Sequence, residues 1–295
     1  MSNRSDVAWS CVLDDTPHIW ASVVPWLATA TGLAQIAPSQ IYVHHVCMLP
    51  PRMAELCEAL KVHTRKIEPF DHRYPHTNKI RQCATTFSEL RRVVLTDVDV
   101  VFTGVLPIDE IQEPVAGKLV DGPNPPMRIL EKIFSTSGVR PPRTCTKGYV
   151  NRESIRVEFH TLLGNYNGGL YVIDHAQLKE IGEAWSFWAR WLIANIGLLA
   201  RWSAHVDQVS FCLAVSQLQI DAGVLADKWN FPLHRRLSAD VAEPLIMHHH
   251  ALLDDRQRIR KTPGRYTRKA IARVNDAIED FQRKHFPGID GAVLG

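Results

Sequence analysis

The pattern that most constrains the fold is an alternation of strand-like and helix-like segments over the first hundred residues. The apolar run VAWSCVL (7–13) is followed by a helical pattern, in which Thr16 stands at the N-cap and a proline in the first turn. QIYVHHV (40–46) and VHTRKIEPF (62–70) predict further strands, the second weaker, with a short helical pattern between them. Alternating strands and helices predict an α/β domain with a mixed, mostly parallel sheet and helices on both faces.

Composition excludes several classes of protein. The chain has 295 residues, of which 45% are hydrophobic, so it can bury a full core. A net charge of +3 does not favour a nucleic acid partner. The first fifteen residues lack a signal-peptide pattern, and the most apolar segment (185–202) carries Arg190, so we expect neither secretion nor a membrane span. Six cysteines without a C-x-x-C pair indicate reduced thiols, and we expect a cytoplasmic protein.

Two acids interrupt the apolar run VVLTDVDVVF (93–102), which we interpret as the fourth strand. Residues i and i+2 of an extended strand point to one side, so Asp97 and Asp99 are expected to project together from the carboxyl edge of the sheet. Like charges repel, so one acid is protonated or a cation lies between them. Oxygen ligands suit Mg²⁺ or Mn²⁺, which also bind nucleotide phosphates. The alternative is structural: one acid caps a turn and the other pairs with Arg91 or Arg92.

The rest of the chain continues the pattern around an irregular insertion. Apolar residues at helical spacing after Asn78 predict a helix that leads into the fourth strand, whereas residues 120–163 are rich in Pro, Gly and Thr and predict a surface excursion beside the site. NYNGGLYVID (165–174) predicts a turn and a strand. Two helices are expected next, and KWNF and PLIMHHH predict late short strands.

The C-terminal tail has its own composition. Residues 256–273 contain eight Arg or Lys residues and no acid, and apolar residues then recur at helical spacing at Ile271, Val274, Ile278 and Phe281. We therefore expect a catalytic domain over residues 1–255 and a basic amphipathic tail over 256–295. The tail either contacts anionic lipid as a peripheral membrane element or packs on the core as a solvated helix.

Several motifs occur in an order that resembles a known family. They are NKI before the helix that precedes the fourth strand, VVLTDVDVVF on that strand, NYNGGLYVID, HVDQ, DKWNF and a late histidine-bearing strand, spread over about residues 7–255. This set resembles the nucleotide-sugar glycosyltransferases of the GT-A fold, most closely the retaining branch that includes glycogenin and the bacterial lipopolysaccharide galactosyltransferases. The resemblance implies metal-dependent transfer of a sugar, expected from a UDP-sugar, to a hydroxyl of a glycan or lipid-linked glycan acceptor in polysaccharide synthesis, at the inner face of a membrane or in the cytoplasm.

The resemblance also implies a metal site for Mn²⁺ or Mg²⁺. Asp97 would contact the ribose or the metal, and Asp99 would be the firmer metal ligand. A histidine after a late strand completes the site in such enzymes, and His248 and His250 share one face of a strand whereas His249 points away. His248 matches best. The alternative for the triplet is a surface cluster or a core imidazole with a backbone partner.

Donor-binding and catalytic residues follow from the same resemblance. Asp207 is the candidate nucleophile and Gln208 the candidate stabiliser of a cationic sugar, unless both merely begin a helix. Glycines let a backbone approach a sugar closely, although a plain turn is the alternative. The expected donor contacts, besides Asp97, are Asp14 at the nucleoside, Lys79 near the diphosphate, and Asn167, Gly168, Gly169, Trp229, Asn230 and Lys261. The family's Lys-Pro-Trp is replaced by RKTPG here, so Arg258 and Arg260 remain alternatives to Lys261.

Other functions remain open. The D-x-D-x-V pattern also fits haloacid dehalogenase-type phosphatases. Those enzymes carry a late acidic pair, which Asp254 and Asp255 could imitate. Their motif usually opens the domain, however, whereas some ninety residues precede it here. A non-catalytic carbohydrate- or nucleotide-binding protein on a transferase fold is a second alternative. A nucleotidyltransferase is a third, but LDDTPHIW is not a Gly-rich phosphate loop.

Overall fold

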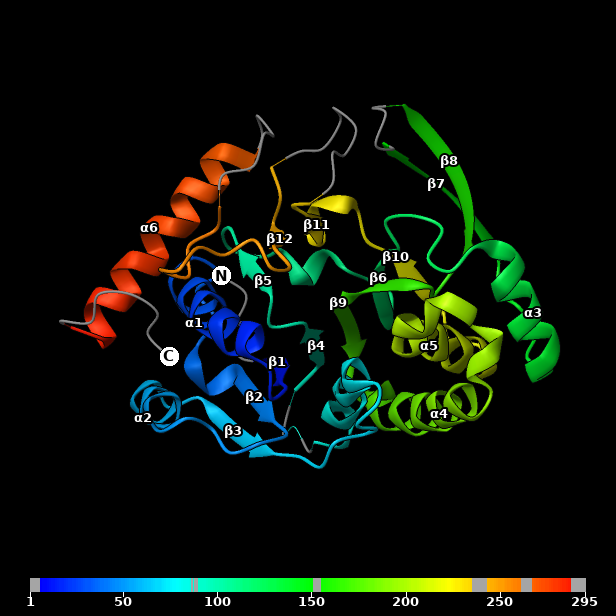
Figure 1. Cartoon of the computed structure of the whole chain (residues 1–295), viewed down its shortest axis with the longest axis horizontal. Coiled ribbons are helices and arrows are strands. Elements are labelled where there is room, and N and C mark those ends of the chain that lie inside the picture. Colours follow the sequence, from blue (N-terminus) through cyan, green and yellow to red (C-terminus); the bar gives the residue numbers. More distant parts are fainter. Residues whose placement is uncertain are drawn as a thin grey trace.

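A seven-stranded sheet forms the centre of the computed structural model, which describes residues 6–85, 87, 90–150, 155–234, 243–260 and 267–287. The strand order is β10-β6-β9-β4-β1-β2-β3, and β9 alone runs antiparallel to its neighbours β4 and β6 (Figure 1). The predicted mixed, mostly parallel sheet is therefore confirmed. The bounds are β1 (Val7–Leu13), β2 (Ile41–His45), β3 (His63–Lys66), β4 (Arg92–Thr96), β6 (Val115–Leu119), β9 (Tyr166–Asp174) and β10 (Ala222–Val224).

Helices cover both faces of this sheet and enclose two hydrophobic clusters (Figure 1). The first cluster includes α1 (Pro17–Gly32), α2 (Pro51–Leu60) and α6 (Thr267–His285), and the second includes α3 (Met127–Ser137), α4 (His175–Ala194) and α5 (Val206–Gln217). No helix in the described part of the chain is long and apolar enough to cross a membrane. Short 3₁₀ helices are η2 (Pro38–Gln40), η3 (Pro75–Ala84), η4 (Ile108–Glu110), η5 (Ile196–Leu198), η6 (Ala200–His205) and η7 (Asp227–Trp229).

The amphipathic C-terminal helix is confirmed, and it packs on the core. The side chains of Ile271, Val274, Ile278 and Phe281 are buried in the cluster that α1 shares. Arg273 also joins α6 to the body of the fold, because its Nε donates to the carbonyl oxygen of Thr103 at 2.8 Å. Since the apolar face of α6 is covered by protein, it is not free to enter a lipid surface.

VVLTDVDVVF is not one strand. β4 ends at Thr96, the chain turns at Val98 and Asp99, and β5 (Val100–Phe102) joins a separate three-stranded sheet. In that sheet β12 (Ile246–His248) lies between β5, to which it is antiparallel, and β11 (Phe231–Pro232). The strand predicted at PLIMHHH is therefore confirmed, whereas KWNF is mostly the 3₁₀ helix η7 and only Phe231 belongs to β11. The turn breaks the extended conformation on which the shared direction of Asp97 and Asp99 depended. The prediction of one continuous strand was therefore wrong.

Two other segments differ from their predicted form. The helix expected from Asn78 is the 3₁₀ helix η3, which ends at Ala84 because Thr85 is extended, with its hydroxyl 2.7 Å from His44 Nε2. Residues 120–163 are more regular than a loop: α3 buries an apolar face, and β7 (Thr144–Val150) and β8 (Arg156–Leu162) form an antiparallel hairpin. The sequence analysis missed these elements because α3 and the hairpin lie between Pro- and Gly-rich turns, whose composition is typical of a loop.

Candidate functional site

The candidate site lies where β4 ends, beside the start of β9. Asp97 and Asp99 occupy the turn between β4 and β5, and the backbone N–H of Asp97 donates to the carbonyl oxygen of Gly169 at 3.3 Å. The predicted NGG segment is therefore part of strand β9 rather than a turn before it. Because β9 pairs with β4, the D-x-D turn and the two glycines are held side by side.

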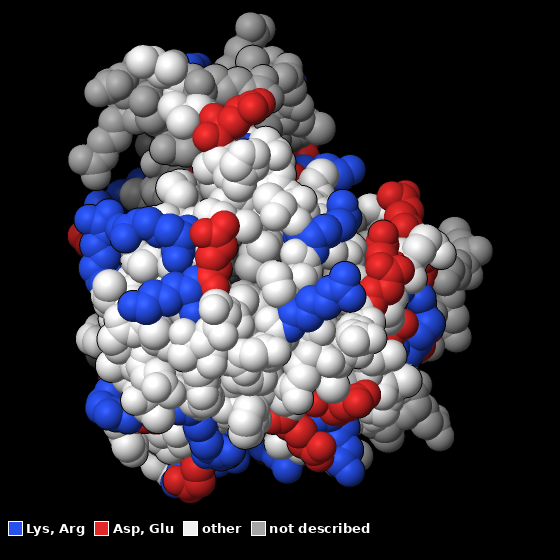
Figure 2. Space-filling model, turned by 90° about the vertical axis from the view of Figure 1, so that its right-hand side faces the viewer, with Lys and Arg blue, Asp and Glu red and all other residues white. Residues whose placement is uncertain are grey.

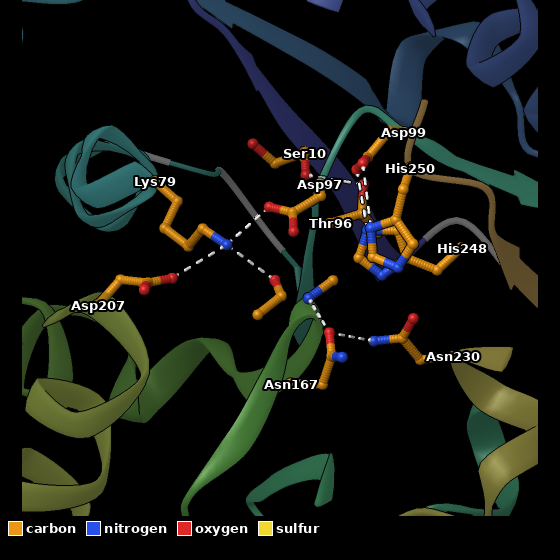
Figure 3. Close-up of polar contacts among 12 residues, drawn as sticks. Ser10, Lys79, Thr96, Asp97, Asp99, Asn167, Asp207, Asn230, His248 and His250 are labelled. Atoms are coloured by element: carbon orange, nitrogen blue, oxygen red, sulfur yellow. Dashed lines mark hydrogen bonds and ion pairs between the residues drawn. The ribbon is translucent and has the colours of Figure 1, made fainter. Parts of the chain in front are cut away.

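Lys79 is a buried cation between two carboxylates (Figure 3). Its Nζ lies 2.6 Å from Asp97 Oδ1 and 3.2 Å from Asp207 Oδ2, and it donates to the carbonyl oxygen of Gly168 at 2.9 Å. Burial disfavours the charged amine, but the carboxylates of Asp97 and Asp207 outweigh burial and raise the pKa of Lys79. Lys79 is thus a permanent charge that joins η3, the D-x-D turn and α5.

Asp99 faces two imidazoles (Figure 3). His248 Nε2 lies 3.1 Å from Asp99 Oδ1, and His250 Nδ1 lies 3.8 Å from Asp99 Oδ2. The two rings stack with their centroids 3.9 Å apart. Burial opposes ionisation of Asp99, but the His248 imidazole holds the pKa of this carboxyl below its usual range. His249 is fully buried, and burial lowers its pKa to about 4, so this side chain is neutral.

The Asp99, His248 and His250 side chains fit a divalent metal ion. Each offers one ligand atom, and these atoms lie within 4.8 Å of one another. Nδ1 of His248 and Nε2 of His250 are buried and have no hydrogen-bond partner among the described residues. Asp97, which we predicted as a ligand, is not in this group. The nearest partner of the Asp97 carboxylate is Lys79, and that of the Asp99 carboxylate is His248.

The two glycines allow both halves of the site to approach the same strand. A Cβ at Gly168 would lie 2.7 Å from Lys79 Nζ and 3.1 Å from Asp207 Oδ2. A Cβ at Gly169 would lie 2.7 Å from both His248 Nδ1 and Asn230 Nδ2. A side chain does not fit at either position unless its neighbours move. The glycines therefore position protein groups of the site directly.

A network of amides continues from Gly169 to a charged pair that the sequence analysis missed. Asn167 Oδ1 accepts from Asn230 Nδ2 at 3.0 Å, and Asn167 Nδ2 donates to Asp121 Oδ2 at 2.8 Å. Asp121 also pairs with Lys118, which is fully buried in β6. Burial lowers the pKa of Lys118 to about 8. Two opposite charges inside the apolar run VAGKLVDG were the available signal.

The remaining predicted residues are spread around this centre. Asp14 accepts from Asn78 Nδ2 at 2.6 Å at the end of β1, and burial raises the pKa of Asp14. Gln208 follows Asp207 in α5, with its Nε2 3.7 Å from the point that a Gly168 Cβ would occupy. Trp229 packs in the hydrophobic cluster that α1 and α6 share. Lys261 lies outside the described residues.

Charged residues near the start of the tail already form ion pairs with other protein groups. Arg258, an alternative to Lys261, pairs with Asp254 at 2.9 Å and with Glu279 of α6 at 3.0 Å. Asp254, one of the acids that could imitate a phosphatase pair, is therefore neutralised by Arg258. On the face that Figure 2 shows, basic and acidic side chains are interspersed and do not form one large area of a single sign.

Comparisons with known proteins support the fold. No protein-family model and no curated protein matches the chain. Among solved structures, the galactosyltransferase LgtC in complex with donor and acceptor sugar analogues is similar at a TM-score of 0.57 and 11% identity, with 95% of this chain and 100% of that chain covered. Apo mouse xyloside xylosyltransferase 1 matches at a TM-score of 0.48 and 13% identity, covering 83% and 98% of the two chains. The likeness to the galactosyltransferase, at so low an identity, concerns the fold, and the chain has the mixed α/β fold of the GT-A type.

Proposed function

We propose that this chain is a metal-dependent glycosyltransferase that moves a sugar from a nucleotide-sugar, expected to be a UDP-sugar, to a hydroxyl acceptor. One observation carries the proposal: Gly168 and Gly169 lie between two polar groups. One is the ionic group of Lys79, Asp97 and Asp207, and the other is the candidate metal site of Asp99, His248 and His250. A nucleotide-sugar needs both, since its diphosphate attracts cations and its sugar needs polar side chains. The galactosyltransferase of similar fold was solved with donor and acceptor sugar analogues, which agrees with this chemistry.

The proposed chemistry concerns charge at the bond between sugar and diphosphate. When that bond breaks, negative charge grows on the phosphate and positive charge on the sugar. A divalent ion held by Asp99, His248 and His250 would supply electrostatic stabilisation of the phosphate charge. On the sugar side Asp207 Oδ2 lies 3.2 Å from Lys79 Nζ, and Asp207 Oδ1 is buried without a hydrogen-bond partner in the described part of the chain.

We assign Asp207 as the side chain that faces the cationic sugar, or that attacks it in a retaining reaction, with Gln208 beside it. Asp14 and Asn78 would hold the nucleoside at the end of β1. Asn167 and Asn230 would offer amides to the sugar or the acceptor. Retention, a hexose donor and a polysaccharide product are part of the same proposal, and the anomeric configuration of the isolated product, read by NMR, tests retention.

A thermal-shift screen tests the function. UDP-, GDP- and CDP-sugars are added with Mn²⁺, then with a chelator, to the unaltered protein, to Asp99→Asn and to the control Asp221→Asn, whose side chain is exposed. We expect one nucleotide class to raise the melting temperature only with metal, and Asp99→Asn to remove this effect while Asp221→Asn retains it. If no nucleotide-sugar stabilises the protein with metal, the proposal is wrong. Release of phosphate from a simple aryl phosphate, without a nucleotide-sugar, would instead favour the phosphatase.

A further inference from the structure

A cleft separate from the candidate site lies between η3 and α4, which pack side by side (Figure 1). Its volume is about 810 Å³, which is in the range of sites for small molecules. The two helices touch directly, since a Cβ at Gly182 of α4 would lie 2.5 Å from the Cβ of Cys83 in η3. Among the described residues that line the cleft, none belongs to the ionic group or to the candidate metal site.

The cleft carries an excess of positive charge. Arg81, Lys179 and Arg190 line it, and Glu183 is the one acid among its lining residues. Within the described part of the chain, no salt bridge joins any of these three cations to a carboxylate. A concave surface of one predominant charge concentrates ions of the opposite sign, so the cleft attracts anions.

Both guanidinium groups of the cleft are stacked on one aromatic ring. The Cζ atoms of Arg81 and Arg190 lie 5.2 Å and 5.3 Å from the centre of the Phe70 ring. The ring is fixed to η3, because the backbone N–H of Phe70 donates to Asn78 Oδ1 at 2.7 Å. Stacking positions a guanidinium through its flat face, so its N–H groups stay available to bind an anion in the plane.

Arg81 has a buried donor without a partner. Its Nη2 donates to the carbonyl oxygen of Pro69 at 3.3 Å, whereas its Nε is buried and has no hydrogen-bond partner among the described residues. Such a donor costs free energy until an acceptor reaches it. Phosphate oxygens are suitable acceptors, because a guanidinium binds phosphate through two parallel N–H···O bonds.

We propose that the cleft between η3 and α4 is a second ligand site, which binds a phosphate group through Arg81, Lys179 and Arg190. The group is either free phosphate or the phosphate of a small sugar phosphate. The site needs no divalent ion, because its positive charges belong to the protein. The inference goes beyond the proposed transfer of a sugar and does not depend on it, since the cleft shares no lining residue with the candidate site.

Isothermal titration of the full chain with inorganic phosphate and with a hexose phosphate tests the inference. The titrations are done at constant ionic strength with a chelator present, so that no metal ion occupies the candidate metal site. We expect saturable binding at one site per chain. Equal affinity for the two ligands supports the site with free phosphate as its ligand, and tighter binding of the hexose phosphate supports it with a sugar phosphate.

Two variants change the affinity in opposite directions. Arg190→Gln should lower it by about 10-fold or more, because charge-assisted hydrogen bonds are lost. Glu183→Gln should raise it by about two- to fivefold, because the one acid of the cleft is removed. The matched control is Arg201→Gln, since Arg201 is also exposed and stacked on a ring, 5.0 Å from that of Trp202, but does not line the cleft. It should bind within about threefold of the unaltered protein.

Three results would overturn the inference. They are no saturable binding of either ligand, unchanged affinity in folded Arg190→Gln, and a loss in Arg201→Gln as large as that in Arg190→Gln. The titration of the unaltered protein needs no variant, so the site can be tested even if a variant fails to fold. Damage to the fold cannot imitate the tighter binding expected of Glu183→Gln.

Discussion

Replacing Gly169 with alanine is expected to weaken metal binding by displacing a ligand. The added Cβ would lie 2.7 Å from His248 Nδ1 and 2.9 Å from its Cε1, and also 2.7 Å from Asn230 Nδ2. The shortest of these distances is about 0.7 Å less than an ordinary contact, so the imidazole must retreat by roughly that much or the backbone must shift. Overpacking of this size costs about 1–3 kcal/mol of stability.

The effect on metal binding follows from the narrow tolerance of ligand distances, which is about 0.2 Å. A shift of several tenths of an ångström at His248 should therefore reduce Mn²⁺ or Co²⁺ affinity by about 10-fold or more, equivalent to about 1.4 kcal/mol. Calorimetric titration measures the affinity, and thermal unfolding shows whether the variant is folded. The matched control is Gly104→Ala, since a Cβ at Gly104 meets no atom within 4 Å.

Gly168→Ala provides a second comparison, because its Cβ would meet Lys79 and Asp207 rather than a histidine. We expect it to destabilise the protein but to leave metal affinity within about threefold of the unaltered value, since the sites are separate. The reasoning is refuted if folded Gly169→Ala binds metal as the unaltered protein does, or if Gly104→Ala or Gly168→Ala weakens binding equally.

Substitutions at Lys79, His44 and Ile278 test the packing and charge arguments by urea unfolding. Lys79→Met leaves two carboxylates without their cation and should cost about 3–5 kcal/mol, part of which Asp97→Asn should restore; a cost below about 1 kcal/mol would contradict the buried ion pair. Burial lowers the pKa of His44 from 6.5 to about 4, so the unfolded chain takes up its proton first and stability should fall by about 3 kcal/mol as pH drops from 6.5 to 4. His44→Asn should flatten this slope, and an unchanged slope would exclude His44 as its source. Ile278→Ala should cost about 2–5 kcal/mol because this side chain of α6 is fully buried; no loss would mean that α6 is not part of the core.

Sequence periodicity predicted the fold correctly where the signal was local. The strand β1, the helix α1 after Thr16 and the apolar face of α6 were all confirmed. The prediction from periodicity was wrong at VVLTDVDVVF, because an apolar run has the same pattern whether it forms one strand or two strands of different sheets. It also missed α3, whose Pro- and Gly-rich surroundings resemble a loop.

The candidate site was also predicted in part from the sequence. The motifs placed Lys79, Asp97, Gly168, Asp207 and His248 among the candidates, and the structure brings all of them together. They did not reveal why both positions are glycine, which is that neighbouring side chains of the site leave no room for a Cβ. They also did not include Lys118 and Asp121, whose only sequence signal was two opposite charges inside an apolar run, and whose pairing depends on the tertiary fold.

The sequence by itself determined the kinds of element and the chemical groups available to this protein, because hydrophobic period and residue type are properties of short segments. The partners of the two acids were decided only by the tertiary structure. Asp97 meets Lys79, which lies 18 positions away, and Asp99 meets His248, which lies 149 positions away. Contacts over such separations depend on how strands cross between sheets, and the turn at Val98 and Asp99 directs each acid to a different partner.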